Sequence, residues 1–135
     1  MADRPLNAFS LAQRSLSAQS VRINAAASNL ANAGSVAASE GEAYRPLRPV
    51  FAQDLDRATG QSTVRVASVV RENAAATQRY DPGHPLADAE GNVWISPVDE
   101  NAEMVEMLEA SRQSENIIEA LSTQKQLMLD TMRLK

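Results

Sequence analysis

The chain has 135 residues and is 44% hydrophobic but only 4% aromatic, so one small domain with few large core side chains is expected. It contains no cysteine, which excludes disulfides and thiol nucleophiles. The net charge is −4, and no apolar run is long enough to span a membrane. The first residues also lack the apolar core of a Sec signal peptide. We therefore expect the protein to stay in the cytoplasm or to be exported by a route that recognises another signal.

Charge is distributed unevenly along the chain. No acid lies between Asp3 and Glu40, whereas the segment 99–119 holds many acids and one base, Arg112. The bases of the first region are Arg4, Arg14 and Arg22. Two interpretations stay open: both regions are solvated helix faces, or the two ends of the chain pack together, within one chain or between chains.

Segment 1–34 has the period of a coiled-coil helix. Large apolar residues recur every seven positions, at Phe9, Leu16, Ile23 and Leu30. This pattern predicts a helix over residues 6–33, with Pro5 tolerated in its first turn and Gly34 as its C-terminal stop.

A second face of this helix carries uncharged polar residues. It consists of Gln13, Ser17, Ser20, Asn24, Ser28 and Asn32. A plain polar surface is one interpretation. The other is a close contact with neighbouring subunits, because short side chains can form hydrogen bonds across a narrow gap. The stretch at residues 24–34, rich in alanine and asparagine, adds Asn29 to this second interpretation.

Segment 35–97 predicts a loop followed by a β-rich arm. Residues 44–51 are extended, but Pro46 and Pro49 exclude a central strand. Residues 62–72 alternate in polarity as a strand does, residues 80–92 are dense in turn formers, and residues 93–95 form a short strand.

Segment 98–135 predicts a second helix, over about residues 100–134, with Asp99 as its N-cap. Its apolar residues follow a 3-4 rhythm that includes Met104, Met107, Ile118, Leu121 and Met128, and Leu108 widens the apolar arc. The predicted fold is therefore mainly α: two terminal helices pair as a coiled coil and form one domain, with the β-rich segment between them. Because the core is thin, we expect the helices to be weakly ordered alone and ordered in an assembly.

No pattern in the chain indicates catalysis. His84, with Asp81 and Asp88 nearby, lies in a turn whose geometry explains these residues more simply than a metal does. A glycine-rich phosphate loop is absent, and three widely spaced arginines without aromatic residues do not indicate nucleic-acid binding. We therefore predict no enzyme activity, cofactor or metal.

The motifs resemble those of the bacterial flagellar axial family of rod and hook proteins. They comprise Ala18-Gln19, Arg22, Asn24 and Ala27 to Ala33, then Tyr44-Arg45, Tyr80 to Pro85, Ala87-Asp88, Gly91, Val93, Val98-Asp99, Glu103-Met104-Val105 and Ala110-Ser111-Arg112. Within that family the order of the motifs is similar to that of proximal rod subunits. Departures stand at Ser96-Pro97, Trp94, Ser114 and Ile117, where individual interface contacts are expected to differ.

The resemblance implies a structural subunit of the proximal rod of the flagellar basal body. Such a subunit polymerises helically, transmits torque and lines the export channel, with the arm outside. It is exported to the periplasm through the type III gate without a cleaved signal peptide. Its partners would be its own copies, other rod subunits, the ring base and the export gate, with no nucleic acid and no membrane span. The alternative is a cytoplasmic helical-hairpin adaptor or secretion chaperone.

We expect Leu16, Ile23 and Leu30 to pack against Met104, Met107, Ile118, Leu121 and Met128. The full set predicted for the coiled coil and the subunit interface is Phe9, Leu16, Ile23, Asn24, Ser28, Asn29, Leu30, Asn32, Met104, Met107, Leu108, Ile118, Leu121 and Met128.

Overall fold

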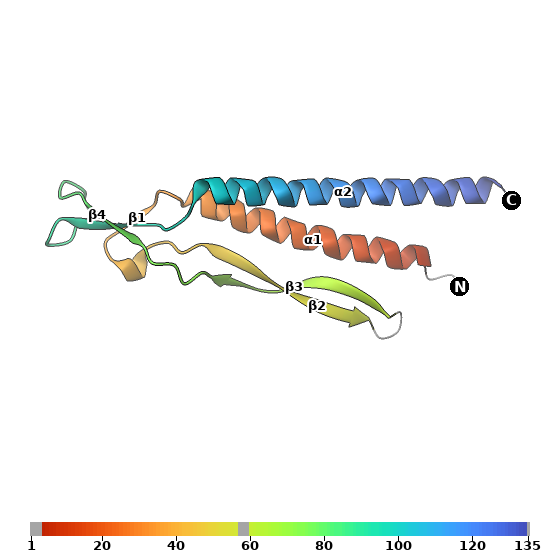
Figure 1. The fold of residues 1–135 in the computed structure, drawn as a ribbon, viewed down its shortest axis with the longest axis horizontal. Coiled ribbons are helices and arrows are strands. Elements are labelled where there is room, and N and C mark those ends of the chain that lie inside the picture. Colours follow the sequence, from red (N-terminus) through yellow and green to blue (C-terminus); the bar gives the residue numbers. More distant parts are fainter. Residues whose placement is uncertain (1–3, 57–59, 135) are drawn as a thin grey trace.

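Two long helices lie side by side in the computed structural model, which describes residues 4–56 and 60–134 (Figure 1). Helix α1 spans Arg4–Ala31 and helix α2 spans Glu100–Arg133, and they run antiparallel. This confirms the predicted fold class of two paired terminal helices with a small β region between them. Residues 1–3 of the predicted segment 1–34 and residue 135 of the predicted segment 98–135 lie outside the described residues.

The ends of the helices are set by side-chain hydrogen bonds. The carboxylate of Asp99 accepts hydrogen bonds from the backbone N–H groups of Asn101 (3.0 Å) and Ala102 (3.2 Å), as predicted for an N-cap. The stop predicted at Gly34 is wrong in its mechanism, because among the described residues only Gly60 and Gly91 have a positive φ. Instead, Asn32 donates a side-chain hydrogen bond to the Ser28 carbonyl (2.8 Å) and closes the last turn.

The arm begins with a two-stranded hairpin that lies along α1 (Figure 1). Strand β2 (Leu47–Asp56) pairs antiparallel with strand β3 (Gln61–Arg71), and the register shifts between Val50 and Phe51. Both predicted extended segments are therefore strands. A two-stranded ribbon has only edge strands, and proline is tolerated in an edge strand, so Pro49 is compatible with β2.

A second, smaller sheet lies at the far end of the molecule. Its strand order is β1 (Val36–Ala37), β5 (Asn92–Ile95) and β4 (Thr77–Tyr80), and a short 3-10 helix, η1 (Glu40–Glu42), precedes the hairpin. Strand β5 was predicted. Strands β1 and β4 were not, because two residues carry no period and the four residues of β4 are all exposed.

The core consists mostly of small side chains. On the two helices, the buried alanines are Ala12, Ala18, Ala25, Ala26 and Ala110. The largest fully buried side chains in the described part of the chain are Glu103, Val93 and Asn29, two of which are polar. The thin core expected from composition is thus observed, and many large apolar residues remain on the surface.

Gly91 provides a test of the small sheet. Its φ is +82°, and an added Cβ would lie 2.9 Å from a ring carbon of Tyr80 and 3.0 Å from Cβ of Pro82. We expect Gly91→Ala to destabilise the fold by about 1–3 kcal/mol, because both the backbone and the space oppose a side chain. The melting midpoint by circular dichroism, at fixed protein concentration, measures this.

Gly34→Ala is the matched control for that substitution. An added Cβ would meet nothing within 4 Å and the φ of Gly34 is not positive, so its midpoint should not fall. Equal midpoints for the two variants would contradict the close packing at Gly91.

The exposed apolar surface of the helices also predicts how order depends on concentration. α1 and α2 contain 28 and 34 residues, but few large side chains are buried between them. We expect circular dichroism of the dilute chain to show less helix than this and a broad melt, with helix content rising as concentration rises. A dilute monomer with full helix content and a sharp transition would contradict this expectation.

Candidate assembly interface

Asn29, near the end of α1, is the residue that joins most of the fold together. Its side-chain amide donates to the Leu47 carbonyl (3.0 Å) and to the carboxylate of Glu103 (3.0 Å). Its carbonyl oxygen accepts from the Leu47 N–H (2.7 Å) and from the Tyr44 hydroxyl (2.9 Å). Asn29 itself is 0% exposed, and its one carboxamide links α1 to α2, to the start of β2 and to the preceding loop.

Glu103 brings a buried charge to the same place. It is 1% exposed, and its second carboxylate oxygen pairs with the Arg48 guanidinium at 2.5 Å. Arg48 also pairs with Glu72 of the hairpin at 2.9 Å. A buried carboxylate requires such partners because its desolvation is otherwise costly. We call Asn29, Tyr44, Arg48 and Glu103 the polar node.

The charge of Arg48 is secured by its carboxylate neighbours. Partial burial disfavours the charged form, but the hydrogen bond and charge of Glu103, followed by those of Glu72, outweigh it and raise the pKa of Arg48. A raised pKa adds stability that is fully present below the unfolded pKa and is lost only as pH rises through the folded value, in strong alkali. The guanidinium therefore stays charged at physiological pH.

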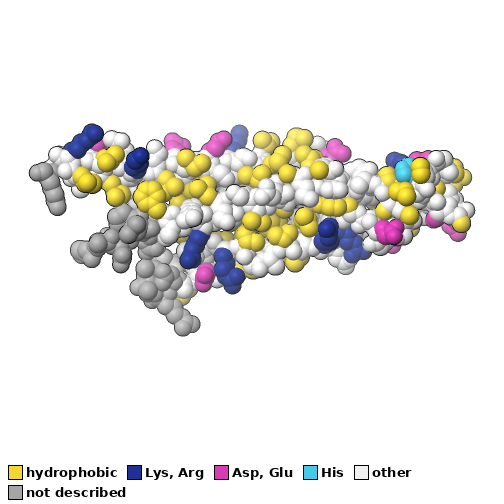
Figure 2. All heavy atoms as spheres, turned by 180° about the vertical axis from the view of Figure 1, so that it is seen from behind, with side chains coloured by type: hydrophobic (Ala, Val, Ile, Leu, Met, Phe, Trp, Pro, Cys, Tyr) yellow, Lys and Arg dark blue, Asp and Glu magenta, His cyan; other side chains and the backbone are white. Residues whose placement is uncertain are grey.

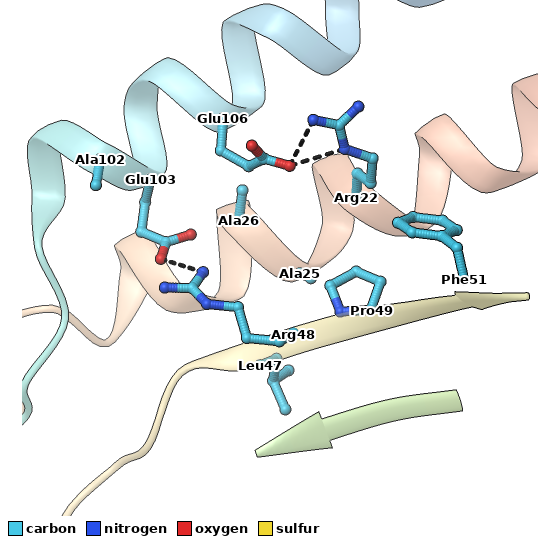
Figure 3. A pocket seen from close by; sticks show the side chains of 10 residues that line it. All are labelled: Arg22, Ala25, Ala26, Leu47, Arg48, Pro49, Phe51, Ala102, Glu103 and Glu106. Carbon is cyan, nitrogen blue, oxygen red and sulfur yellow. Dashed lines mark hydrogen bonds and ion pairs between the residues drawn. The ribbon is translucent and has the colours of Figure 1, made fainter. Parts of the chain in front are cut away.

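A groove lies beside the node, between α1, α2 and β2, and has a volume of about 310 Å³ (Figure 3). Ala25 and Ala26 of α1 and Pro49 and Phe51 of β2 line it. The ion pair of Arg48 with Glu103 borders it, as does a second ion pair from α1 to α2 (Figure 3).

This second ion pair joins Arg22 and Glu106 at 2.7 Å, and Arg22 also donates to Gln113 (3.0 Å). The electrostatic complementarity predicted between the two ends is therefore confirmed within one chain for this pair. Arg14 instead contacts the hairpin, through Thr63 at 3.1 Å. The side chain of Arg4 lies outside the part of the chain whose side chains are described.

The large apolar residues predicted for the coiled coil divide into two groups in the structure, one half-buried and one exposed. Half-buried positions are Leu16, Ile23, Leu30, Met107 and Leu121. Met104 and Ile118 are 49% and 56% exposed, so they are not buried within one chain, and their place in the predicted coiled coil stays a prediction. The buried residues of the two helices are small or polar instead: Ala12, Ala18, Ala25, Ala26, Asn29, Glu103 and Ala110.

The exposed group forms an outward apolar set. It comprises Phe9 (41%), Met104 (49%), Leu108 (60%), Ile118 (56%) and Met128 (36%), with the percentages giving exposure. Figure 2 shows apolar side chains in patches along much of one face of the elongated body. Surface of this kind marks contact sites for other molecules.

Near the C-terminal end of α1, residues of the serine–asparagine face form hydrogen bonds within the chain. Ser28 shares a hydrogen bond with the Tyr44 hydroxyl (3.1 Å), and Asn29 and Asn32 form the bonds given above. These three side chains thus form hydrogen bonds within the chain, and their predicted role at subunit contacts stays a prediction. Asn24 is exposed, so its predicted role in assembly stays a prediction.

Sequence reasoning missed the functions of Tyr44, Arg48 and Glu103. Tyr44 and Glu103 appeared only as matched motif positions. The only signal in the sequence was an asparagine in an alanine-rich helix, together with a glutamate and an arginine elsewhere in the chain. No local period relates residues 29, 48 and 103, so their contact could not be predicted.

Among the departures from the family motifs, Ser114 donates a hydrogen bond to the Ala110 carbonyl of its own helix (2.9 Å).

The described residues contain no group of three or more histidine, cysteine, aspartate or glutamate side chains placed to hold a metal ion. No helix in the described ranges is both long and apolar enough to cross a membrane. The charged groups of the node are already paired with one another, so their arrangement holds elements together and leaves no acid or base free for chemistry.

Comparison with known proteins gives consistent relatives. The chain is 48% identical over 131 residues to the flagellar basal-body rod protein FlgC of Salmonella typhimurium, with 96% of each chain covered. It is 45% identical to FlgC of Escherichia coli O6:H1 over the same length, and 32% identical over 132 residues to FlgC of Agrobacterium fabrum. No protein-family model matches the chain.

Asn29→Ala tests the polar node. The substitution raises helix propensity but leaves the Glu103 carboxylate, the Tyr44 hydroxyl and the Leu47 peptide groups each short of a partner. We expect a loss of about 2–4 kcal/mol, measured by denaturant unfolding at a concentration where the parent chain unfolds cooperatively.

Asn24→Ala is the matched control on the same helix. Because Asn24 is exposed, its stability should change by less than about 0.5 kcal/mol. If the two variants unfolded at the same denaturant concentration, the node would not hold the fold together.

Proposed function

The chain belongs to the FlgC family of flagellar basal-body rod proteins, which are structural rod subunits and not enzymes, and from this premise we propose that it polymerises helically in the proximal rod. In that assembly it transmits torque and lines the export channel. Its partners are other copies of itself, other rod subunits, the ring base and the export gate. The rod portion lies in the periplasm, and the chain reaches it without a cleaved signal peptide.

The observation that carries this proposal is the outward apolar set on α1 and α2. Leu108 and Ile118 are 60% and 56% exposed on one long helix, and none of the residues that the structure describes covers them. Fully burying one such side chain contributes roughly 1.5–3 kcal/mol, so neighbours that cover several of them would stabilise the assembled state strongly.

The polar node supports the mechanical part of the proposal. Torque passes through a subunit only if its elements keep their relative positions under load. Asn29 and the ion pair of Arg48 with Glu103 fix α1, α2 and β2 against one another by bonds of defined direction. Apolar packing between alanines alone would resist sliding less well, since it has no directional component.

The adaptor or chaperone alternative is not retained. The relatives that match nearly the full length of this chain are rod proteins by name. Nothing specific in the described residues favours a cytoplasmic dimer.

Fractionation tests the proposed function. In cells whose own copy is deleted, we expect loss of swimming and its restoration by an epitope-tagged copy of this chain. The tagged chain should sediment with purified hook–basal bodies. Recovery of the chain only as a soluble cytoplasmic dimer would contradict the proposal.

Leu108→Glu sharpens that experiment. It places a charge in the outward apolar set without touching the polar node, so the helix content of the free chain should be retained while incorporation into basal bodies falls at least about tenfold. Leu108→Met is the matched control and should be incorporated as the parent chain is, because it keeps the apolar volume.

A further inference from the structure

A second cleft, which shares only Tyr44 with the polar node, lies where the chain leaves α1 and enters the arm. Its volume is about 690 Å³. The lining includes Asn32, Ser35, Glu42, Tyr44, Arg45 and Arg71. The Ser35 hydroxyl is buried and has no hydrogen-bond partner among the described residues. The proposed function uses none of these groups except Tyr44, whose hydroxyl points to Asn29.

Two arginines of this cleft lack an acidic partner. Arg71 donates to the Arg45 carbonyl (3.1 Å), and its guanidinium carbon lies 5.4 Å from the centre of the Tyr44 ring. Arg45 donates to Asn73 at 3.4 Å. Within residues 8–55 and 60–134, whose side chains the structure describes, no carboxylate lies within 4.0 Å of either guanidinium.

The contrast with other arginines is informative. Arg14, Arg22, Arg48, Arg65, Arg79 and Arg133 each lie within 4.0 Å of a carboxylate. The lining of the cleft contains two arginines and one acid, Glu42, and Glu42 forms an ion pair with neither arginine. The Tyr44 ring and the neighbouring hydrogen bonds hold Arg71 in place before any partner arrives, which lowers the entropy that binding would cost.

The complementary groups lie on α2. Glu115 and Glu119 are both exposed, and they stand four residues apart, so they share one side of the helix. Like charges at this spacing destabilise an isolated helix by a few tenths of a kcal/mol. The neighbouring base, Arg112, makes no ion pair with them in the described structure.

The two sites cannot meet within one chain. Arg71 is paired in register with Leu47, and Leu47 is joined through Asn29 to Glu103. At 1.5 Å per residue, Glu115 and Glu119 lie about 18 Å and about 24 Å further along α2 than Glu103. Glu115 and Glu119 can therefore reach this cleft only from another copy.

We propose that the cleft at Arg45 and Arg71 binds the Glu115–Glu119 pair of a second copy of this chain. The inference rests on the proposed function, since it requires copies to be neighbours. Because the donor and the acceptor surfaces differ, the contact can repeat head-to-tail from copy to copy, and a head-to-tail contact that does not close into a ring builds an open helical polymer.

Charge exchange tests the contact. One variant carries Arg45→Glu and Arg71→Glu, a second carries Glu115→Arg and Glu119→Arg, and a third carries all four substitutions. Each of the first two should reduce incorporation into basal bodies at least about tenfold, because like charges then face each other. The third should restore incorporation, because the pairing returns with its polarity exchanged.

Controls separate assembly from folding. Arg79→Glu, which reverses a charge elsewhere on the arm, and the pair Arg45→Lys with Arg71→Lys should both be incorporated as the parent chain is. Circular dichroism of each variant checks the fold. If the glutamate substitutions in the cleft lower helix content, Arg45→Gln with Arg71→Gln replaces them, with the same expected loss of incorporation.

The outcomes are distinct. Normal incorporation of either reversed pair overturns the inference, and so does failure of the fourfold variant to recover when its helix content matches that of the parent chain. In both cases the parent chain still sediments with basal bodies, so the proposed function stands. Absence of the parent chain from basal bodies would instead overturn the proposed function, and this inference with it.

Discussion

The buried carboxamide of Asn29 is the constraint on which the arrangement of the two helices and the hairpin depends. Both of its N–H groups and both lone pairs of its oxygen are used, by partners from α2, from β2 and from the loop that precedes β2. Because an unpaired polar group is costly at zero exposure, no partner can move away alone without loss of free energy. Glu103 extends the same constraint to Arg48 and thus to the hairpin.

Small residues make this polar node possible. Alanines along α1 allow α2 and the hairpin to approach closely enough for short side chains to bridge the gap. The consequence is a core with little apolar surface, while larger residues such as Leu108 and Ile118 remain outside. A chain built in this way has directional bonds inside and apolar surface outside, which suits a subunit whose stability is completed by its neighbours.

Charge follows the same division between inside and outside. Arg22 and Arg48 neutralise acids of α2 within the chain. Arg45 and Arg71 on one surface, and Glu115 and Glu119 on another, form no ion pair among the side chains that the structure describes. Interior pairs fix the shape of the subunit. Unpaired surface charges of opposite sign, placed too far apart to meet, provide specificity between copies, because a misplaced neighbour would bring like charges together.

The sequence by itself determined the elements that depend on local pattern. The two helices, the Asp99 cap, the strand over residues 62–72 and the edge character of the proline-containing strand all follow from periodicity and backbone chemistry. The order of the motifs also indicated the family, and the relatives of nearly one-half identity belong to that family. Strands β1 and β4 escaped prediction because they are too short or too exposed to carry a period.

Only the tertiary structure decided which faces meet. Met104 and Ile118 have the spacing of a coiled-coil contact, but they remain on the surface, whereas Glu103 and Ala110 of the same helix are buried. Asn29, Arg48 and Glu103 are far apart in the chain, and no local rule relates them. Their contact depends on the position of the hairpin against α1, which is a property of the whole fold, whereas periodicity reports only on neighbours along one element.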